Sequence, residues 1–231
     1  MQIKILSIFP QLLEPFFEES ILSRAIQRGL IQIEAIDLRS FTDDRHKVVD
    51  DYPYGGGPGM VMKPEPLAKA INALSEPGHP RIYLTPQGET FNQNIAEQLA
   101  KLPGMLLVCG RYRGIDERIR QHYLDREISL GDFVISGGEL AALVVVEAVV
   151  RLIPGVLGNE DSVEAESFSR GLLDSPQYTR PEDFEGLKVP EVLLSGNHDR
   201  ISSWRKEQAR KRTEERRPDI LVNKANDSDN S

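Results

Sequence analysis

Alternating strand and helix patterns predict an α/β fold in which helices cover a mostly parallel sheet. Short apolar runs predict the strands, and longer segments with a period near 3.6 residues predict the helices. The predicted elements are strands at residues 3–9, 31–36, 81–84 and 105–109, and helices at residues 11–28, 92–102, 115–124 and 139–153. Since helices separate these strands along the chain, parallel pairing follows.

Length and composition describe a globular protein with room for two domains. The chain has 231 residues, of which 39% are hydrophobic and 28% charged, as is usual for folded domains. The longest apolar stretch, residues 140–153, is interrupted by Glu147 and Arg151, so it predicts a buried helix and no membrane span. The first ten residues are too short and alternating for a signal peptide, and Cys109 is the only cysteine. We therefore expect a cytoplasmic protein without internal disulfides.

A change of composition after Gly158 divides the chain. The predicted parts are an α/β domain at residues 1–158, a flexible linker at 159–175, a small helical domain at 176–222 and a disordered tail at 223–231. The net charge of -8 argues against indiscriminate binding of nucleic acid, yet residues 200–217 hold eight Lys and Arg residues. That segment is either a solvated helix face, which its charge alone favours, or a local contact for phosphates.

Three polar loops follow predicted strands and point to a ligand site. They are TPQG at residues 85–88, GRYRG at 110–114 and LGDFVISGG at 130–138. Ligands of open α/β sheets bind beyond the carboxyl ends of the strands, where such loops converge. None of the three carries a dinucleotide or P-loop fingerprint, so an ordinary NAD or ATP site is not indicated.

The third loop has a second interpretation. Gly131, Gly137 and Gly138 allow a ligand to approach the backbone, above a rigid apolar helix. Ser136 and Glu139, however, have the Ser-x-x-Glu spacing of a capping box, which would make the motif only a helix start. The residues alone leave both interpretations open.

Residues 43–60, DDRHKVVDDYPYGGGPGM, combine acids, a histidine, aromatic residues and four glycines. His46 and Asp50 suggest a metal site, but the ligand set is incomplete and a solvated loop is the commoner outcome. The run YGGGPG predicts a tight loop whose backbone is open to close approach.

Taken together, these segments resemble the bacterial tRNA (guanine-N1)-methyltransferases of the trefoil-knotted SPOUT superfamily. The resemblance covers nearly the whole chain and rests on SIFP, DRHKVVDDYPYGGGPGM, YLTPQG, LLVCGRYRGIDER, SLGDFVISGGE, RLIPGVLG, GLLDSPQYTRP and VLLSGNH, in the family's order. It implies an enzyme that uses S-adenosylmethionine to methylate N1 of guanosine 37 of tRNA. It also implies a deep C-terminal trefoil knot, which ordinary topology rules would exclude, and a homodimer whose site is completed by the partner subunit.

The family's binding residues carry over to matching positions of this chain. The cofactor-binding residues implied in this way are Tyr83, Leu84, Pro86, Gly110, Arg113, Leu130, Gly131, Asp132, Phe133, Val134, Ile135, Gly137, Gly138 and Leu140. The implied tRNA contacts are His46, Gly55, Gly56, Gly57, Gly59, Trp204 and Arg205. The sequence does not support a magnesium site.

Methylation at N1 requires a base for the N1 proton and a cation for the charge that develops at O6. The resemblance assigns the cation to Arg151, although a cation at a helix carboxyl end is favourable without any catalytic role. It assigns the base to Glu166, where the family usually has aspartate, with Glu164 and Asp161 as weaker candidates.

Arg113 stands where the family commonly has glutamate. It either pairs with Glu166 in a coupled exchange or changes the electrostatics of the cofactor site. These departures leave a second hypothesis, a noncatalytic tRNA-binding relative, and a third, an α/β nucleotide enzyme without the usual fingerprints.

Overall fold

The computed structural model describes residues 1–158, 166–168 and 171–221. The chain separates into two compact units, Met1–Gly158 and Asn159–Ser231, and each is described by itself. The tail expected at 223–231, most of the linker and the weaker base candidates Asp161 and Glu164 lie outside the described residues. Among the described helices, none combines the length and apolar character needed to cross a membrane.

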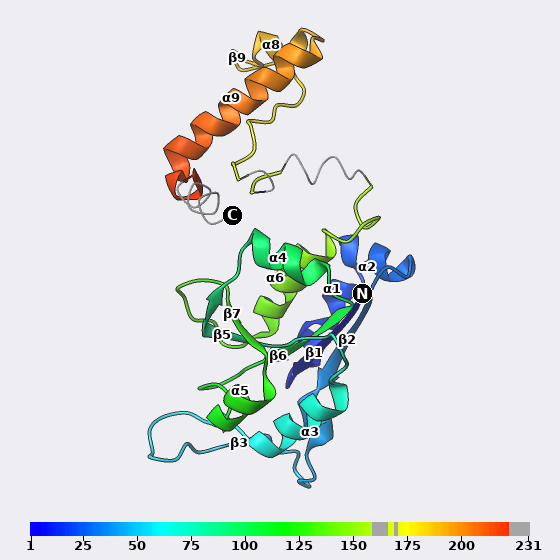
Figure 1. Ribbon diagram of the computed structural model, residues 1–231, viewed down its shortest axis with the longest axis vertical. Helices are drawn as coiled ribbons and strands as arrows, with labels where there is room; N and C mark the ends of the chain where they lie inside the picture. Colours follow the sequence, from blue (N-terminus) through cyan, green and yellow to red (C-terminus); the bar gives the residue numbers. More distant parts are fainter. Residues whose placement is uncertain (159–165, 169–170, 222–231) are drawn as a thin grey trace. The chain divides into compact units, whose positions relative to one another are not determined.

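The first unit is built on a five-stranded parallel sheet, which confirms the predicted α/β class (Figure 1). Its strands are β1 (Gln2–Ser7), β2 (Gln32–Asp37), β5 (Arg81–Thr90), β6 (Gly104–Cys109) and β7 (Arg126–Ser129), in the spatial order β2-β1-β6-β5-β7. Every residue of the central strand β6 is buried. A sheet covered on both faces explains why its central strand β6 is a nearly continuous apolar run.

Helices cover both faces of this sheet. The helical elements are η1 (Pro10–Leu12), α1 (Glu14–Phe17), α2 (Ser20–Gln27), η2 (Leu38–Phe41), α3 (Pro64–Leu74), α4 (Gln93–Ala100), α5 (Glu117–Tyr123) and α6 (Glu139–Val150). Because side chains alternate along a strand, Met105, Leu107 and Cys109 pack with α2, α4 and α6, whereas Leu106 and Val108 pack with α3 and α5. Figure 1 shows α4 and α6 on one side of the sheet and α3 and α5 on the other.

The helix predicted at residues 11–28 is wrong, because the structure has three short pieces there. Pro15 lies in the first turn of α1, where its missing N–H costs nothing, but it would break a longer helix. Ser20 has a φ of 59°, in the left-handed region, and this turns the chain between α1 and α2. The structure also adds α3, which the sequence analysis did not predict.

The glycine-rich segment forms the expected loop. It connects β3 (Asp50–Asp51) and β4 (Val61–Met62), a short antiparallel pair. Gly55, Gly56, Gly57 and Gly59 all have positive φ angles, between 75° and 110°. Other residues rarely adopt such angles, so the glycines are required by the path of the backbone.

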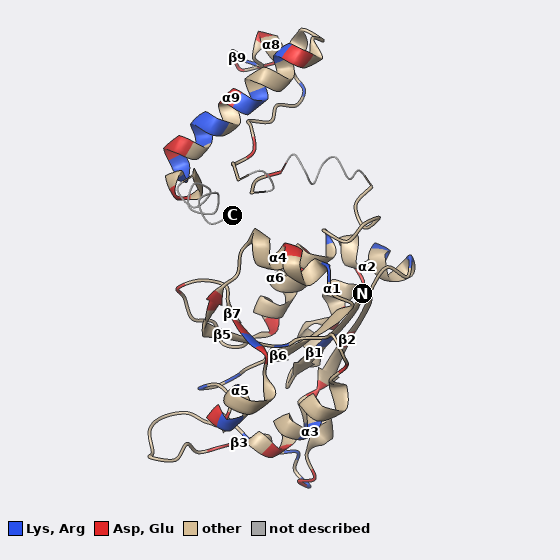
Figure 2. Ribbon diagram, viewed as in Figure 1, with Lys and Arg blue, Asp and Glu red and all other residues tan. Residues whose placement is uncertain are grey.

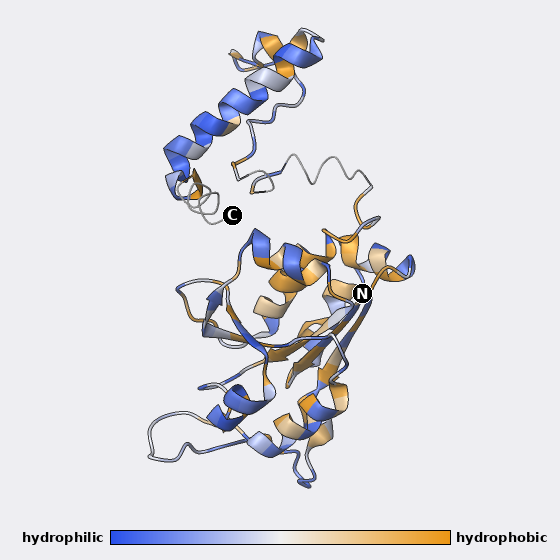
Figure 3. Cartoon of the chain, in the orientation of Figure 1, coloured by the Kyte–Doolittle hydropathy of each residue, from blue (hydrophilic) through white to orange (hydrophobic). Residues whose placement is uncertain are grey.

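The second unit contains a short hairpin, β8 (Asp183–Phe184) and β9 (Leu187–Lys188), followed by α8 (Glu191–Leu194) and α9 (His198–Arg216). Asn197 caps α9 by accepting a hydrogen bond from the Arg200 N–H at 3.1 Å. Lys and Arg residues recur along α9 (Figure 2), and most of the helix is hydrophilic, in contrast to α6 (Figure 3). The Leu173 N–H donates to the buried Thr213 hydroxyl at 2.9 Å and ties the preceding segment to this helix.

Candidate active site

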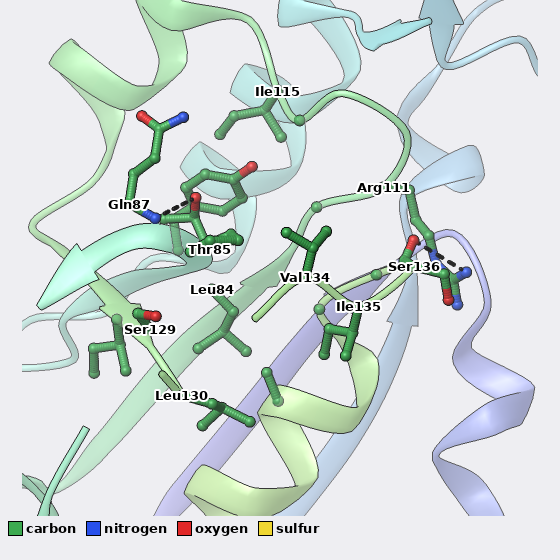
Figure 4. A pocket seen from close by; sticks show the side chains of 18 of the residues that line it. Leu84, Thr85, Gln87, Arg111, Ile115, Ser129, Leu130, Val134, Ile135 and Ser136 are labelled. Carbon is green, nitrogen blue, oxygen red and sulfur yellow. Dashed lines mark hydrogen bonds between the residues drawn. The ribbon is translucent and has the colours of Figure 1, made fainter. Parts of the chain in front are cut away.

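The carboxyl ends of β5, β6 and β7 open onto one cavity of about 360 Å³ in the first unit (Figure 4). The three loops singled out by the sequence meet there, as expected for neighbouring parallel strands. The TPQG segment, predicted as a loop, lies within β5 (Arg81–Thr90), where the pairing with β7 is irregular between Leu84 and Glu89. Such an irregularity bends a strand next to a site.

Most of the predicted cofactor-binding residues line this cavity. Those lining it are Tyr83, Leu84, Pro86, Gly110, Arg113, Leu130, Phe133, Val134, Ile135, Gly137 and Gly138. Gly131, Asp132 and Leu140 do not line it, and Leu140 is 59% exposed. Ala141, one residue further along α6, lines it instead.

Two glycines let the loops approach one another closely. The Gly138 N–H donates to the Gly110 carbonyl at 2.9 Å. A Cβ at Gly138 would lie 2.8 Å from Cys109 Cα, and a Cβ at Gly110 would lie 2.6 Å from the Tyr83 hydroxyl. A side chain at either position therefore requires the backbone or the Tyr83 ring to move, which explains why both are glycine.

Glu139 is not a capping residue, so the capping-box interpretation is wrong. Gly138 is the N-cap of α6 and no side chain caps this helix end. The Glu139 carboxylate is 1% exposed and accepts hydrogen bonds from the Ser7 hydroxyl at 2.6 Å and from Arg111 Nε at 2.9 Å. The Arg111 guanidinium also lies 4.7 Å from the centre of the Phe9 ring. A buried ion pair thus connects β1, the 110–114 loop and the start of α6.

A second ion pair lies beside Gln87. Arg120 donates to both carboxylate oxygens of Glu127, at 2.9 and 2.7 Å, and to Gln87 Oε1 at 3.0 Å. Its guanidinium lies 5.9 Å from the centre of the Tyr83 ring. Burial raises the pKa of the Tyr83 hydroxyl, so this group stays neutral and acts only through hydrogen bonds.

A family model described as tRNA (Guanine-1)-methyltransferase TrmD matches residues 1–223. The chain belongs to this family. It is 56% identical over 228 residues to the tRNA (guanine-N(1)-)-methyltransferase of Chloroflexus aggregans, with 97% of this chain and 89% of that protein covered. The proteins of the same name from Dictyoglomus turgidum and Dehalococcoides mccartyi are 54% and 53% identical, each with 96% of this chain and 90% of the relative covered. The resemblance inferred from the motifs is confirmed.

The catalytic candidates implied by the TrmD resemblance are not brought together within the first unit. Arg151 follows the last turn of α6, which spans 12 residues, so its backbone lies roughly 18 Å from Gly138 at the start of the helix. Glu166 belongs to the second unit, where it lines a hollow beside α9.

The predicted tRNA contacts also fall in both units. His46 lies in the turn before β3, where its N–H donates to the Asp44 carboxylate at 2.7 Å, and the four glycines lie in the β3–β4 loop. Trp204 lies on α9 with its ring centre 6.5 Å from that of Tyr178, and Arg205 lies on the same helix. In the described part of the chain, no three His, Cys, Asp or Glu side chains form a group that could hold a metal ion.

Thr85, Gln87, Arg111, Tyr112, Gly114 and Ser136 also line the cavity, and the sequence predicted them only as parts of the three loops. The lining residues outside the predicted loops are Ile115, Arg120, Ile128, Ser129 and Ala141. Four of these lie directly beside or close to the loops in sequence, so the loop signal could have found them. Arg120 is the exception, because it reaches the cavity from α5.

Proposed function

We propose that this protein transfers the methyl group of S-adenosylmethionine to N1 of guanosine 37 in tRNA. The observation that carries the proposal is the cavity formed by the three loops, in a chain whose TrmD family match extends over residues 1–223. The relatives are named for methyl transfer to N1 of a tRNA guanine.

The cavity fits the proposed cofactor in size and in chemistry. A volume of about 360 Å³ is within the usual range for small-molecule sites. Leu84, Ile135 and Ala141 supply apolar walls, and Thr85, Gln87 and Ser129 supply polar side chains that can bond an adenine or an amino-acid group. When bound, S-adenosylmethionine supplies a methyl group on a positively charged sulfur.

The residues of the chain must then position the guanine and remove its N1 proton. Alignment of the attacking nitrogen with the methyl group accounts for much of such catalysis. We assign proton removal to the Glu166 carboxylate and stabilisation of the charge at O6 to the Arg151 guanidinium. The extra carbon–carbon bond of glutamate extends its reach by roughly 1.5 Å relative to aspartate, and the segment before Glu166 must accommodate this.

The position of Arg151 supports a homodimer. In one protomer its backbone lies roughly 18 Å from the cavity end of α6, so it serves the cavity of a partner more readily than its own. Leu140 and Val144, 59% and 48% exposed, occupy the same face of α6 as Arg151, at intervals of four and seven residues. This apolar stripe is suited to contact a second copy.

We also propose the family's trefoil knot for residues 81–150. The bond between Gly138 and Gly110 and the backbone bridge between Arg111 and Gly137 hold the third loop against the second, and such contacts between loops are compatible with a threaded chain. Binding of tRNA is assigned to the β3–β4 loop and to α9, whose Lys and Arg residues suit a phosphate backbone.

One assay tests the function. The protein is incubated with labelled S-adenosylmethionine and two tRNA transcripts that carry guanosine or adenosine at position 37. We expect label in the guanosine transcript alone. Binding of both cofactor and tRNA without label would support the noncatalytic relative, and absence of cofactor binding would reject both hypotheses.

The role of Glu166 has its own test. Glu166→Gln removes the base at almost constant shape and should abolish methylation, whereas Glu166→Asp should retain it. Cofactor and tRNA binding serve as controls for folding. Full activity of the Gln variant would remove Glu166 from the mechanism.

A further inference from the structure

Three arginines line the cavity, and one of them differs from the others. Arg111 is paired with Glu139 and Arg120 with Glu127. For Arg113, no carboxylate partner occurs among the residues that the structure describes, and its side chain is exposed. A guanidinium carries five N–H donors, and the hydrogen bond recorded for this one goes to the Pro58 carbonyl at 3.1 Å.

The location of Arg113 is fixed from both sides. Its backbone N–H donates to the Met60 carbonyl at 3.1 Å, and the Met62 N–H donates to the Gly114 carbonyl at 3.0 Å. The Arg113 side chain then lies against the glycine-rich loop, so that a Cβ at Gly57 or at Gly59 would lie 3.0 Å from it. The Arg113 guanidinium therefore lies beside the glycine-rich loop, and Arg113 is also one of the residues that line the cavity.

The surroundings are suited to a nucleotide. Tyr52 and Tyr54, in the same loop, are 79% and 102% exposed and offer rings on which bases can stack. A nucleotide whose base enters the cavity carries a phosphate on either side, and these phosphates must remain near the opening. An arginine is the residue that best binds phosphate through several parallel hydrogen bonds.

We propose that Arg113 binds a backbone phosphate of the tRNA beside the nucleotide that enters the cavity. The proposal rests on the proposed function. It gives Arg113 a role toward the RNA substrate rather than toward the cofactor, because the Arg113 side chain extends toward the glycine-rich loop.

The test compares the salt dependence of tRNA binding in the wild type, Arg113→Gln, Arg113→Lys and the control Arg118→Gln. Glutamine removes the charge but keeps a polar N–H donor on a shorter side chain, and lysine keeps the charge. Arg118 is a suitable control because its side chain is 69% exposed, is paired with Asp116 and does not line the cavity. Binding of S-adenosylmethionine is measured for each protein by calorimetry.

Loss of one phosphate contact should reduce the slope of log K against log[salt] by about 0.7 to 0.9. We expect this change and a weakening of about tenfold at low salt in Arg113→Gln, an unchanged slope in Arg113→Lys, and wild-type behaviour in Arg118→Gln. Cofactor affinity should not change in any variant.

Three other outcomes would reject the proposal. Weaker cofactor binding with an unchanged salt slope would place Arg113 on the cofactor's carboxylate. A lower kcat with unchanged affinities would place Arg113 at the reacting centre. An equal reduction of the salt slope in Arg118→Gln would indicate a general electrostatic effect of the protein's positive charges. If the wild type fails to methylate tRNA but Arg113→Gln still lowers the salt slope, the proposed function fails while the phosphate contact stands.

Discussion

Replacement of Glu139 by alanine should destabilise the first unit strongly. The variant removes a carboxylate that is 1% exposed, and leaves the Arg111 guanidinium and the Ser7 hydroxyl without it. Breaking one side of a buried ion pair costs about 3–5 kcal/mol. Because the Arg111 side chain is 17% exposed and can gain some water, we expect the lower value of about 3 kcal/mol. This corresponds to a change of roughly 140-fold in the unfolding equilibrium constant.

Urea unfolding at fixed protein concentration measures this loss as a shift of the midpoint with an unchanged m-value. Glu139→Gln keeps the shape and an oxygen for Ser7, so it should lose less than the alanine variant. Glu97→Ala, at a partly exposed position on α4, is the control and should stay within about 0.5 kcal/mol of the wild type. A loss below about 1 kcal/mol in Glu139→Ala would refute the claim that this ion pair holds β1, the 110–114 loop and α6 together.

Three further predictions follow from the same region and its sheet. Gly138→Ala places a Cβ 2.8 Å from Cys109 Cα, so calorimetry should show at least tenfold weaker binding of S-adenosylmethionine, and wild-type affinity would contradict the close packing. Burial raises the pKa of the Cys109 thiol well above its usual value, so a thiol reagent at pH 8 should react slowly with the native protein and rapidly in denaturant; equal rates would show an accessible thiol. The hydrogen bond from Arg81 lowers the pKa of Asp125 below its usual value, so its contribution to stability is present above pH 4 and lost as the pH falls through the lowered pKa. Asp125→Asn should therefore be less stable than wild type at pH 7, and urea unfolding at a series of pH values should show the difference shrinking as the pH falls below 4.

The strands could be predicted from sequence because β1 and β6 are short, mostly apolar runs that the sheet buries, whereas β2 alternates polar and apolar residues at the edge of the sheet. Local sequence patterns predicted the helices less accurately than the strands. The apolar period at residues 11–28 continued across Pro15 and Ser20, where the backbone cannot continue a helix. The start of α3 was signalled by Pro64 in its first turn, a known preference of helix N-termini.

The candidate site contains contacts that local sequence patterns cannot predict. The convergence of the three loops could be predicted, because strand order places the carboxyl ends of parallel strands at one edge. The role of Glu139 could not, since its partners Ser7 and Arg111 lie 132 and 28 residues away in the chain. The three-residue spacing between Ser136 and Glu139 suggested a capping box. In the structure, the Ser7 hydroxyl and the Arg111 guanidinium hold the Glu139 carboxylate by hydrogen bonds instead.

The strand order has a consequence for synthesis of the chain on the ribosome. β1 can pair with β2 as soon as Asp37 has emerged, but its other edge waits for β6, which begins at Gly104. At about 5–20 residues per second, this interval lasts on the order of 3–15 s. During that time the backbone N–H and C=O groups on the unpaired edge of β1 can pair with strands of other chains. Nascent chains of this protein should therefore depend on holding chaperones until Cys109 has left the exit tunnel.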